Sequence, residues 1–191
     1  MYQVVIIGAG PVGGRMATEL ASRGISTLMI EEHAEIGRPF QCAGLVNPPA
    51  MQMVGLEDTI LQNVDGALIH SPSGIMVPVG KDGRIRTHVV CRKKFDQAVV
   101  AQAMEAGAHL WLLSKPIDAE VVKNGVNIKV EREGELVDLK CNLLIGADGA
   151  HSWTRRYFKM GRPKEMMIGF QTDVSGLSGK DNWLEMYTGR D

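Results

Sequence analysis

The sequence predicts an α/β protein whose parallel sheet is built from the amino terminus onward. Tyr2 to Ile7 is a short, β-branched and apolar run, typical of a strand that is buried on both faces. A glycine-rich turn follows, and Met16, Ala17 and Leu20 then recur at the spacing of a helix. A second apolar strand is predicted from Ile25 to Ile30. Strand, turn, helix and strand in this order indicate the first unit of a parallel sheet.

The turn after the first strand reads GAGPVG, in which Gly8, Gly10 and Gly13 have the G-x-G-x-x-G spacing. Gly8 permits the tight turn, Gly10 lets the backbone approach a pyrophosphate, and Gly13 lets the helix pack close to the strand. The start of the helix offers free N–H groups and a positive dipole end to phosphates. Glu31, at the end of the second strand, is placed to accept a hydrogen bond from a ribose 2′-hydroxyl. The pattern predicts a Rossmann-like site for FAD or NAD rather than NADP, and a glycine turn without a ligand is the alternative.

The composition is that of a globular protein and argues against several functional classes. The net charge of −1 gives no attraction to nucleic acid or to an anionic membrane. We expect neither a signal peptide nor a spanning helix, because no charged leader or long apolar run precedes the first strand. Cys42, Cys91 and Cys141 are odd in number and form no CxxC pair. They therefore indicate reduced thiols in the cytoplasm and give no support for a metal site.

The rest of the chain predicts mostly strands. They are expected at 64–70, 75–79, 85–91, 109–113, 118–122, 126–130, 136–140, 143–145, 166–174 and 184–187. Helices are expected near 50–54, at 92–106 and at 151–158. Asn124-Gly125 is a strong hairpin turn, so a β-meander is predicted where NAD-binding Rossmann domains usually cross over by a helix.

Three segments together carry a family resemblance: GAGPVGG, the arginine before a helix in CRKKFDQAV, and GADGAHSWTRR. They resemble FAD-dependent oxidoreductases of the para-hydroxybenzoate hydroxylase fold. Within that group, IGRPFQCAGLV is similar to the geranylgeranyl reductase family, and LEMYTGRD resembles the strand that leads into that family's substrate segment. The resemblance spans nearly the whole chain, and its three flavin motifs are the specific ones.

The resemblance implies a set of FAD-binding residues, some of which act through the backbone. They are Gly8, Gly10, Val12, Gly13, Glu31, Cys42, Ala43, Gly44, Arg92, Asp148 and Gly149. Ile117, at the start of the meander, is a further candidate, whose backbone would contact the adenine. Two of the polar members also have a structural interpretation. Arg92 is alternatively a solvated charge at a helix end, and Asp148 alternatively a turn residue, with a role as helix N-cap expected in either case.

Cys42 is the one predicted catalytic residue. It lies in a polar, glycine-flanked loop, and the resemblance implies a position near the reactive face of the flavin, where it would position substrate or relay a proton. The alternative is that Cys42 is a small buried hydrophobic residue, as free cysteines most often are.

The function implied by the resemblance is reduction of isoprenoid double bonds of prenyl lipids or their precursors, with hydride from N5 of reduced FAD. An electron donor, a ferredoxin or NAD(P)H, would reduce the flavin. A cytoplasmic protein with peripheral membrane contact is expected from such a substrate. The alternatives are an aromatic-ring monooxygenase of the same fold and a truncated nucleotide-binding module with no activity by itself.

The resemblance also predicts how the chain is organised. An FAD-binding domain is expected at 1–62 and 85–160, and part of a β-rich substrate domain at 63–84 and 161–191. The family's third FAD motif, a Gly-Asp pair that opens a late helix, does not occur after Gly149. Because members of the family are also about twice as long, we expect an amino-terminal portion of such a protein; a compact natural variant is the alternative.

Overall fold

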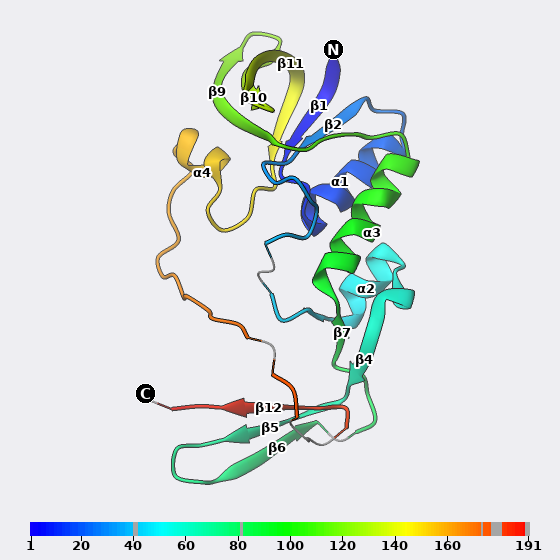
Figure 1. The fold of residues 1–191 in the computed structure, drawn as a ribbon, viewed down its shortest axis with the longest axis vertical. Coiled ribbons are helices and arrows are strands. Elements are labelled where there is room, and N and C mark those ends of the chain that lie inside the picture. The colour runs from blue at the N-terminus through cyan, green and yellow to red at the C-terminus, as the bar shows by residue number, and fades with distance from the viewer. Residues whose placement is uncertain (40–41, 81, 173, 177–180, 190–191) are drawn as a thin grey trace. The chain divides into compact units, whose positions relative to one another are not determined.

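The computed structural model describes residues 1–39, 42–80, 82–172, 174–176 and 181–189 (Figure 1). The chain divides into two compact units, the first formed by Met1–Phe40 and Phe95–Ile168 and the second by Gln41–Lys94 and Gly169–Asp191. This division groups residues 42–62 with the second unit, whereas the predicted domain limits put them in the FAD-binding domain. The functional assignment of the two domains stays a prediction.

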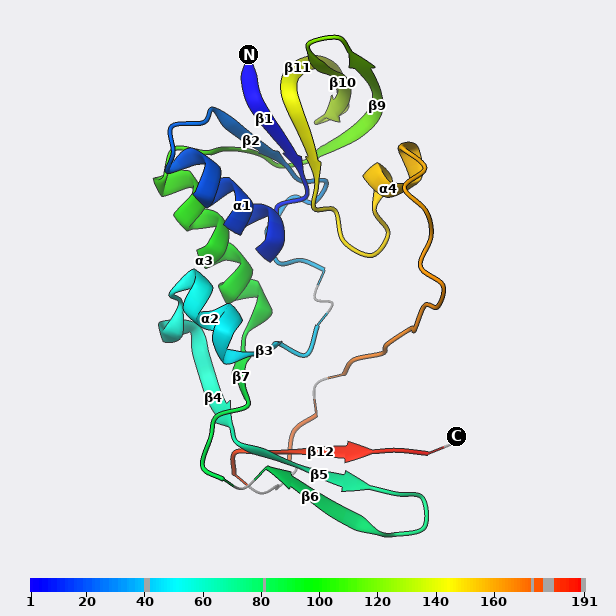
Figure 2. The same cartoon turned by 180° about the vertical axis from the view of Figure 1, so that it is seen from behind.

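The first unit contains a six-stranded mixed sheet with the order β8-β2-β1-β11-β10-β9 (Figures 1 and 2). Its strands are β1 (Tyr2–Ile7), β2 (Thr27–Ile30), β8 (His109–Trp111), β9 (Ser114–Val122), β10 (Gly125–Arg132) and β11 (Glu135–Gly146). The pairs β8–β2, β2–β1 and β1–β11 are parallel, while β10 is antiparallel to both β9 and β11. The predicted parallel sheet and β-meander are therefore confirmed.

The single strand β11 covers the ranges of two predicted strands. The sequence predicts separate strands at 136–140 and 143–145, but the chain runs straight through from Glu135 to Gly146. Its first part pairs with β10 and its last part with β1, and Cys141 lies opposite both Val126 and Tyr2. Separate strands are wrong here because Asn142, the polar residue that interrupts the apolar pattern, lies within one continuous strand.

Helix α1 (Pro11–Ala21) and the part of α3 (Arg92–Glu105) from Phe95 onward pack together in the first unit. A Cβ added to Gly14 of α1 would lie 2.9 Å from a methyl group of Val99, so the two helices are in close contact. Phe95, Val99 and Ala103, which recur every four residues along one side of α3, are buried. Figure 2 shows both helices on one side of the sheet.

Strand β1 supplies two hydrophobic clusters, one on each face of the sheet. Val4 and Ile6 belong to the cluster that contains Ala17 of α1 and Ala103 of α3. The alternate residues of β1, with Ile128 of β10, belong to the other cluster. This alternation is the two-residue period of a strand buried on both faces, as predicted for Tyr2 to Ile7.

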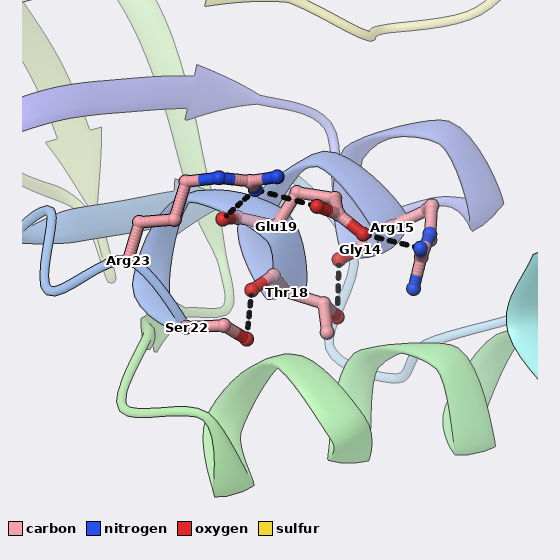
Figure 3. A network of polar contacts seen from close by, with 6 residues as sticks. All are labelled: Gly14, Arg15, Thr18, Glu19, Ser22 and Arg23. Carbon is pink, nitrogen blue, oxygen red and sulfur yellow. Dashed lines mark hydrogen bonds and ion pairs between the residues drawn. The ribbon is translucent and has the colours of Figure 1, made fainter.

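Side chains of α1 form a polar network along the helix (Figure 3). Glu19 pairs with Arg15 and with Arg23, which lie one turn before and one turn after it. The hydrogen bond from Arg23, followed by the charge of Arg15, holds the pKa of Glu19 below its ordinary value. Ser22 Oγ donates to the carbonyl of Thr18 at 2.7 Å. These contacts link successive turns of the helix from Gly14 to Arg23.

The segment after β11 contains the helix α4 (Trp153–Tyr157), which is shorter than the helix predicted at 151–158. The strand predicted at 166–174 is wrong for its described residues, which are irregular. Met167 and Phe170 are almost fully exposed there. An apolar run becomes a strand only where a neighbouring strand pairs with its backbone, and none does so among the described residues.

The second unit contains two three-stranded sheets and a short helix. One sheet has the order β12-β5-β6 and is formed by β5 (Gly66–His70), β6 (Met76–Gly80) and β12 (Trp183–Tyr187). The other has the order β3-β7-β4 and is formed by β3 (Leu45–Val46), β4 (Ile60–Val64) and β7 (Thr87–Val90). Helix α2 (Pro48–Val54) is capped by Asn47, and Glu57–Thr59 is a short 3₁₀ helix. Within the described part of the chain, no helix is both long and apolar enough to cross a membrane.

Candidate functional site

In the glycine turn between β1 and α1, a side chain would clash with the backbone at two of the three motif glycines and would meet open space at the third. Gly8 has φ +96°, and a Cβ there would lie 2.5 Å from the carbonyl oxygen of Ala147. A Cβ on Gly13 would lie 2.0 Å from the carbonyl oxygen of Gly8. A Cβ on Gly10 would meet no atom within 4 Å. Packing of the chain therefore requires the glycines at 8 and 13, whereas Gly10 leaves room for a ligand to approach the backbone.

Helix α1 begins at the residue after Gly10. Gly10 is its N-cap, in an extended conformation and without a side chain to occupy the first N–H groups, and Pro11 opens the helix. The side chain of Val12 is largely exposed, and the contact of its backbone with FAD stays a prediction. Unoccupied N–H groups at the start of a helix bind anions, and the small Gly10 gives a phosphate access to them.

Glu31, directly after β2, turns its carboxylate toward the glycine turn. Its Oε2 accepts a hydrogen bond from the backbone N–H of Ala9 at 3.0 Å, and its side chain is only 14% exposed. The backbone of Glu31 is fixed by strand pairing, because its N–H donates to Trp111 and its carbonyl accepts from Ser114, both at 2.8 Å. The carboxylate is therefore held beside the turn.

His33 completes the surroundings of Glu31 and was not among the predicted site residues. The Oε1 of Glu31 accepts from the backbone N–H of His33 at 3.1 Å and lies 2.6 Å from Nδ1 of its imidazole. No local pattern predicts this contact, because Glu32 and His33 form a bend after β2 instead of continuing the strand.

The second glycine motif meets the first in the structure. The Cβ of an alanine at Gly8 would lie 3.0 Å from Cα of Asp148, so the two turns are in contact. Gly149 has φ +69°, and a Cβ there would meet no atom within 4 Å. Chain segments that are far apart in the sequence thus place Gly8, Asp148 and Gly149 at one end of the parallel strands, where open α/β sheets bind their ligands.

Asp148 contacts α4 but is not its N-cap, so that expectation is wrong. The N-cap is Ser152, whose Oγ accepts from the N–H of Arg155 at 2.9 Å. Asp148 Oδ2 instead accepts from both the N–H and the hydroxyl of Thr154, at 2.9 and 3.0 Å. A cap must lie immediately before the helix, and three residues separate Asp148 from Ser152.

Ile117 lies at a β-bulge in β9. Lys129 is opposite Asp118, and the next residue, Val130, is opposite Pro116, so Ile117 is left out of the register with β10. A bulged residue has backbone groups outside the regular ladder. This is compatible with a backbone contact to adenine, which stays a prediction.

The remaining predicted residues belong to the second unit, where they flank one end of the β3–β7 ladder. Gly44 accepts a hydrogen bond from the N–H of Val90 at 2.9 Å and has φ +77°. Its own N–H donates to the half-buried sulfur of Cys42 at 3.5 Å. Ala43 links these two residues, and Arg92 opens α3 two residues after Val90. The roles of Cys42, Ala43, Gly44 and Arg92 toward FAD stay predictions. Phe40 and Gln41 of the IGRPFQCAG segment lie outside the described residues.

The residues of the first unit fit the adenosine diphosphate half of a dinucleotide. The open space at Gly10 and the start of α1 suit a pyrophosphate, and the carboxylate of Glu31 suits a ribose hydroxyl. Among the described residues, no atom lies within 4 Å of a Cβ built at Gly10.

Comparison with known proteins also indicates a dinucleotide-binding protein, one that binds FAD. The model of the family described as "FAD binding domain" matches residues 1–189. A digeranylgeranylglycerophospholipid reductase of Picrophilus torridus is 37% identical over 79% of this chain and 40% of its own length. The enzyme of that name from Methanocaldococcus jannaschii is 32% identical over 100% of this chain and 50% of its own length.

A solved structure extends the similarity to the fold. The crystal structure of a geranylgeranyl bacteriochlorophyll reductase-like protein from Thermoplasma acidophilum matches with a TM-score of 0.81 and 27% identity, over 98% of this chain and 50% of that one. The chain thus spans about half the length of the relatives it matches. The match over residues 1–189, and the dinucleotide-binding turn within them, show that the chain belongs to the FAD-binding domain family.

Proposed function

We propose that this chain functions in an FAD-dependent oxidoreductase that reduces isoprenoid double bonds of prenyl lipids or their precursors. The observation that carries the proposal is the similarity to digeranylgeranylglycerophospholipid reductases, which extends over the whole chain in the Methanocaldococcus jannaschii relative. The glycine turn and Glu31 support the cofactor, because their geometry fits its adenosine half. A cytoplasmic protein in contact with a membrane surface is part of the proposal, since the substrate is a lipid.

In this proposal, the chain's residues position the cofactor, and the cofactor supplies hydride when it is reduced. The N–H groups that open α1 hold the pyrophosphate, and Glu31 accepts a hydrogen bond from the ribose. Cys42 acts near the substrate, where its thiol orients the alkene or passes a proton to it. The N–H of Gly44, which donates to the sulfur of Cys42, fixes the orientation of that thiol. A ferredoxin or NAD(P)H is the proposed electron donor.

The experiment combines the purified protein with FAD, a chemical reductant and a digeranylgeranylglycerophospholipid without oxygen. Mass spectrometry of the lipid should find two added hydrogen atoms for each saturated double bond. Gly10→Val is the control that blocks the pyrophosphate, and it should abolish the reaction. Cys42→Ala should keep FAD bound and lower the rate.

Other results would separate the alternatives. Incorporation of an oxygen atom into a small phenol in air, with no alkene reduction, would favour a monooxygenase. FAD binding without any product would favour a nucleotide-binding module. Unchanged turnover in Cys42→Ala would remove that thiol from the mechanism.

A further inference from the structure

We infer that His33 is a positioning residue of the FAD site, which holds the Glu31 carboxylate in the orientation that binds the ribose. Two separate donors of His33, its backbone N–H and its ring, meet Oε1 of Glu31, and Ala9 meets Oε2. The inference concerns the cofactor site alone and does not depend on which substrate the protein reduces.

The hydrogen bonds leave one acceptor position of the carboxylate for a ligand. An ionised carboxylate has about four lone-pair positions. The two contacts of His33 use those of Oε1, and the N–H of Ala9 uses one of Oε2. The fourth position is therefore on Oε2, the oxygen that lies beside the glycine turn. A ribose hydroxyl can donate to it without displacing any contact within the protein.

The ring of His33 is the contact that a substitution can remove without moving the chain. The carbonyl of His33 accepts from the N–H of Leu113 at 3.2 Å, and its N–H is held by Glu31, so the backbone is fixed on both sides. The imidazole itself is 41% exposed, whereas the Glu31 side chain is 14% exposed. Loss of the ring should therefore leave the fold intact and free the carboxylate to rotate about its side-chain bonds.

The ring must donate from Nδ1 for this role, because an ionised carboxylate only accepts. An asparagine places an amide N–H near the position of Nδ1, whereas a glutamine reaches farther and an alanine has no donor. His33→Asn should therefore retain much of the function that His33→Ala and His33→Gln lose. This ordering separates a directed hydrogen bond from a general effect of side-chain size.

The experiment measures binding of ADP by calorimetry and of FAD by flavin fluorescence to the full chain and to these three variants. We expect His33→Ala to weaken ADP binding about tenfold, the size of one hydrogen bond to a charged group. The melting temperature of the protein without ligand should stay unchanged. His109→Ala is the matched control, because the Nδ1 of His109 pairs with the hydroxyl of Tyr2 at 2.8 Å, away from the glycine turn.

Deoxy analogues of ADP test whether the effect passes through the ribose. With 2′-deoxy-ADP or 3′-deoxy-ADP, whichever lacks the hydroxyl that Glu31 binds, the difference between wild type and His33→Ala should largely disappear. Equal losses for ADP and both analogues, or no rescue by asparagine, would overturn the inference and leave His33 a structural residue. Unaltered ADP affinity in His33→Ala would overturn it outright. A wild-type protein that binds neither FAD nor ADP would overturn the cofactor site together with the inference, whereas a failure to reduce lipids would affect neither.

Discussion

The two units bury their strands very differently. In the first unit, four consecutive residues of β1, Val4 to Ile7, are buried, because their side chains alternate between two apolar clusters, one on each face of the sheet. In the second unit, every residue of β6 is exposed, including Val77 and Val79. A sheet is stable by itself only when it buries an apolar face, so the first unit has the core of an independent domain. The glycine turn and Glu31 lie on this rigid unit, which is where a precisely placed binding site belongs.

The largest effect is expected from Gly13→Ala in the first unit. The new Cβ would lie 2.0 Å from the backbone oxygen of Gly8, so α1 must move away from β1. We expect a loss of at least about 3 kcal/mol in the free energy of unfolding, together with loss of FAD binding. Urea denaturation measures the first and flavin fluorescence the second.

Gly10→Ala is the matched control, because its Cβ meets no atom within 4 Å and the backbone is extended. It should keep the wild-type stability and lose only affinity for FAD. Equal stability of the two alanine variants would show that the close contact at Gly13 relaxes freely.

A smaller effect is expected from Gly44→Ala in the second unit. Position 44 has φ +77°, and a Cβ would lie 2.1 Å from the carbonyl oxygen of Val90, so the β3–β7 pairing must open. We expect a local loss of about 2 kcal/mol. Hydrogen exchange should show faster exchange in β3 and β7 but unchanged protection in β1.

Gly55→Ala serves as the control, since it has a similar φ of +63° but no atom within 4 Å of the added Cβ. It reports the strain of a left-handed residue alone. Faster exchange in β1 of Gly44→Ala would mean that the two units unfold together.

Thiol reactivity gives a milder test of the same comparison. Cys141 of the first unit is fully buried, and burial raises the pKa of its thiol, so it is both inaccessible and protonated. Cys42 and Cys91 of the second unit are half-buried. We expect an alkylating reagent to modify these two first and Cys141 only after the first unit unfolds, as peptide mass analysis would measure. Early modification of Cys141 would contradict a closed first core.

The smallest effect concerns the acid stability of α1. The pKa of Glu19 in the folded protein is held below its ordinary value of 4.5. The ion pairs of Glu19 therefore stabilise the folded protein fully above pH 4.5, and this stabilisation is lost as the pH falls through the lowered pKa. Glu19→Gln should be slightly less stable than wild type at neutral pH, and the difference should vanish in acid. Because Glu19 is exposed, the difference should also shrink in high salt. A difference that persists in acid would assign the effect to packing instead of charge.

The sequence predicted the first unit better than the second for a physical reason. Local patterns specify β1, α1 and the Asn124-Gly125 hairpin, because each is bounded by its own turn residues and periodicity. The pairing of β12 with β5 joins segments more than a hundred residues apart in the chain, and β3 has only two residues, so neither leaves a local signal. The glycine turn was predicted at the residue level, while the contacts of Asp148 and the place of His33 depend on side-chain directions that no pattern contains.

The contact of Gly8 with Ala147 has a consequence for how the protein is made. The first eight residues leave the ribosome long before their partner, and until residue 147 follows them the tight bend after β1 lacks the backbone against which it rests. Strand β1 also lacks its neighbour β11 until that time, because β11 ends at Gly146. A nascent polypeptide of the first hundred residues should therefore be unable to retain flavin, and cofactor capture becomes a late event in biosynthesis.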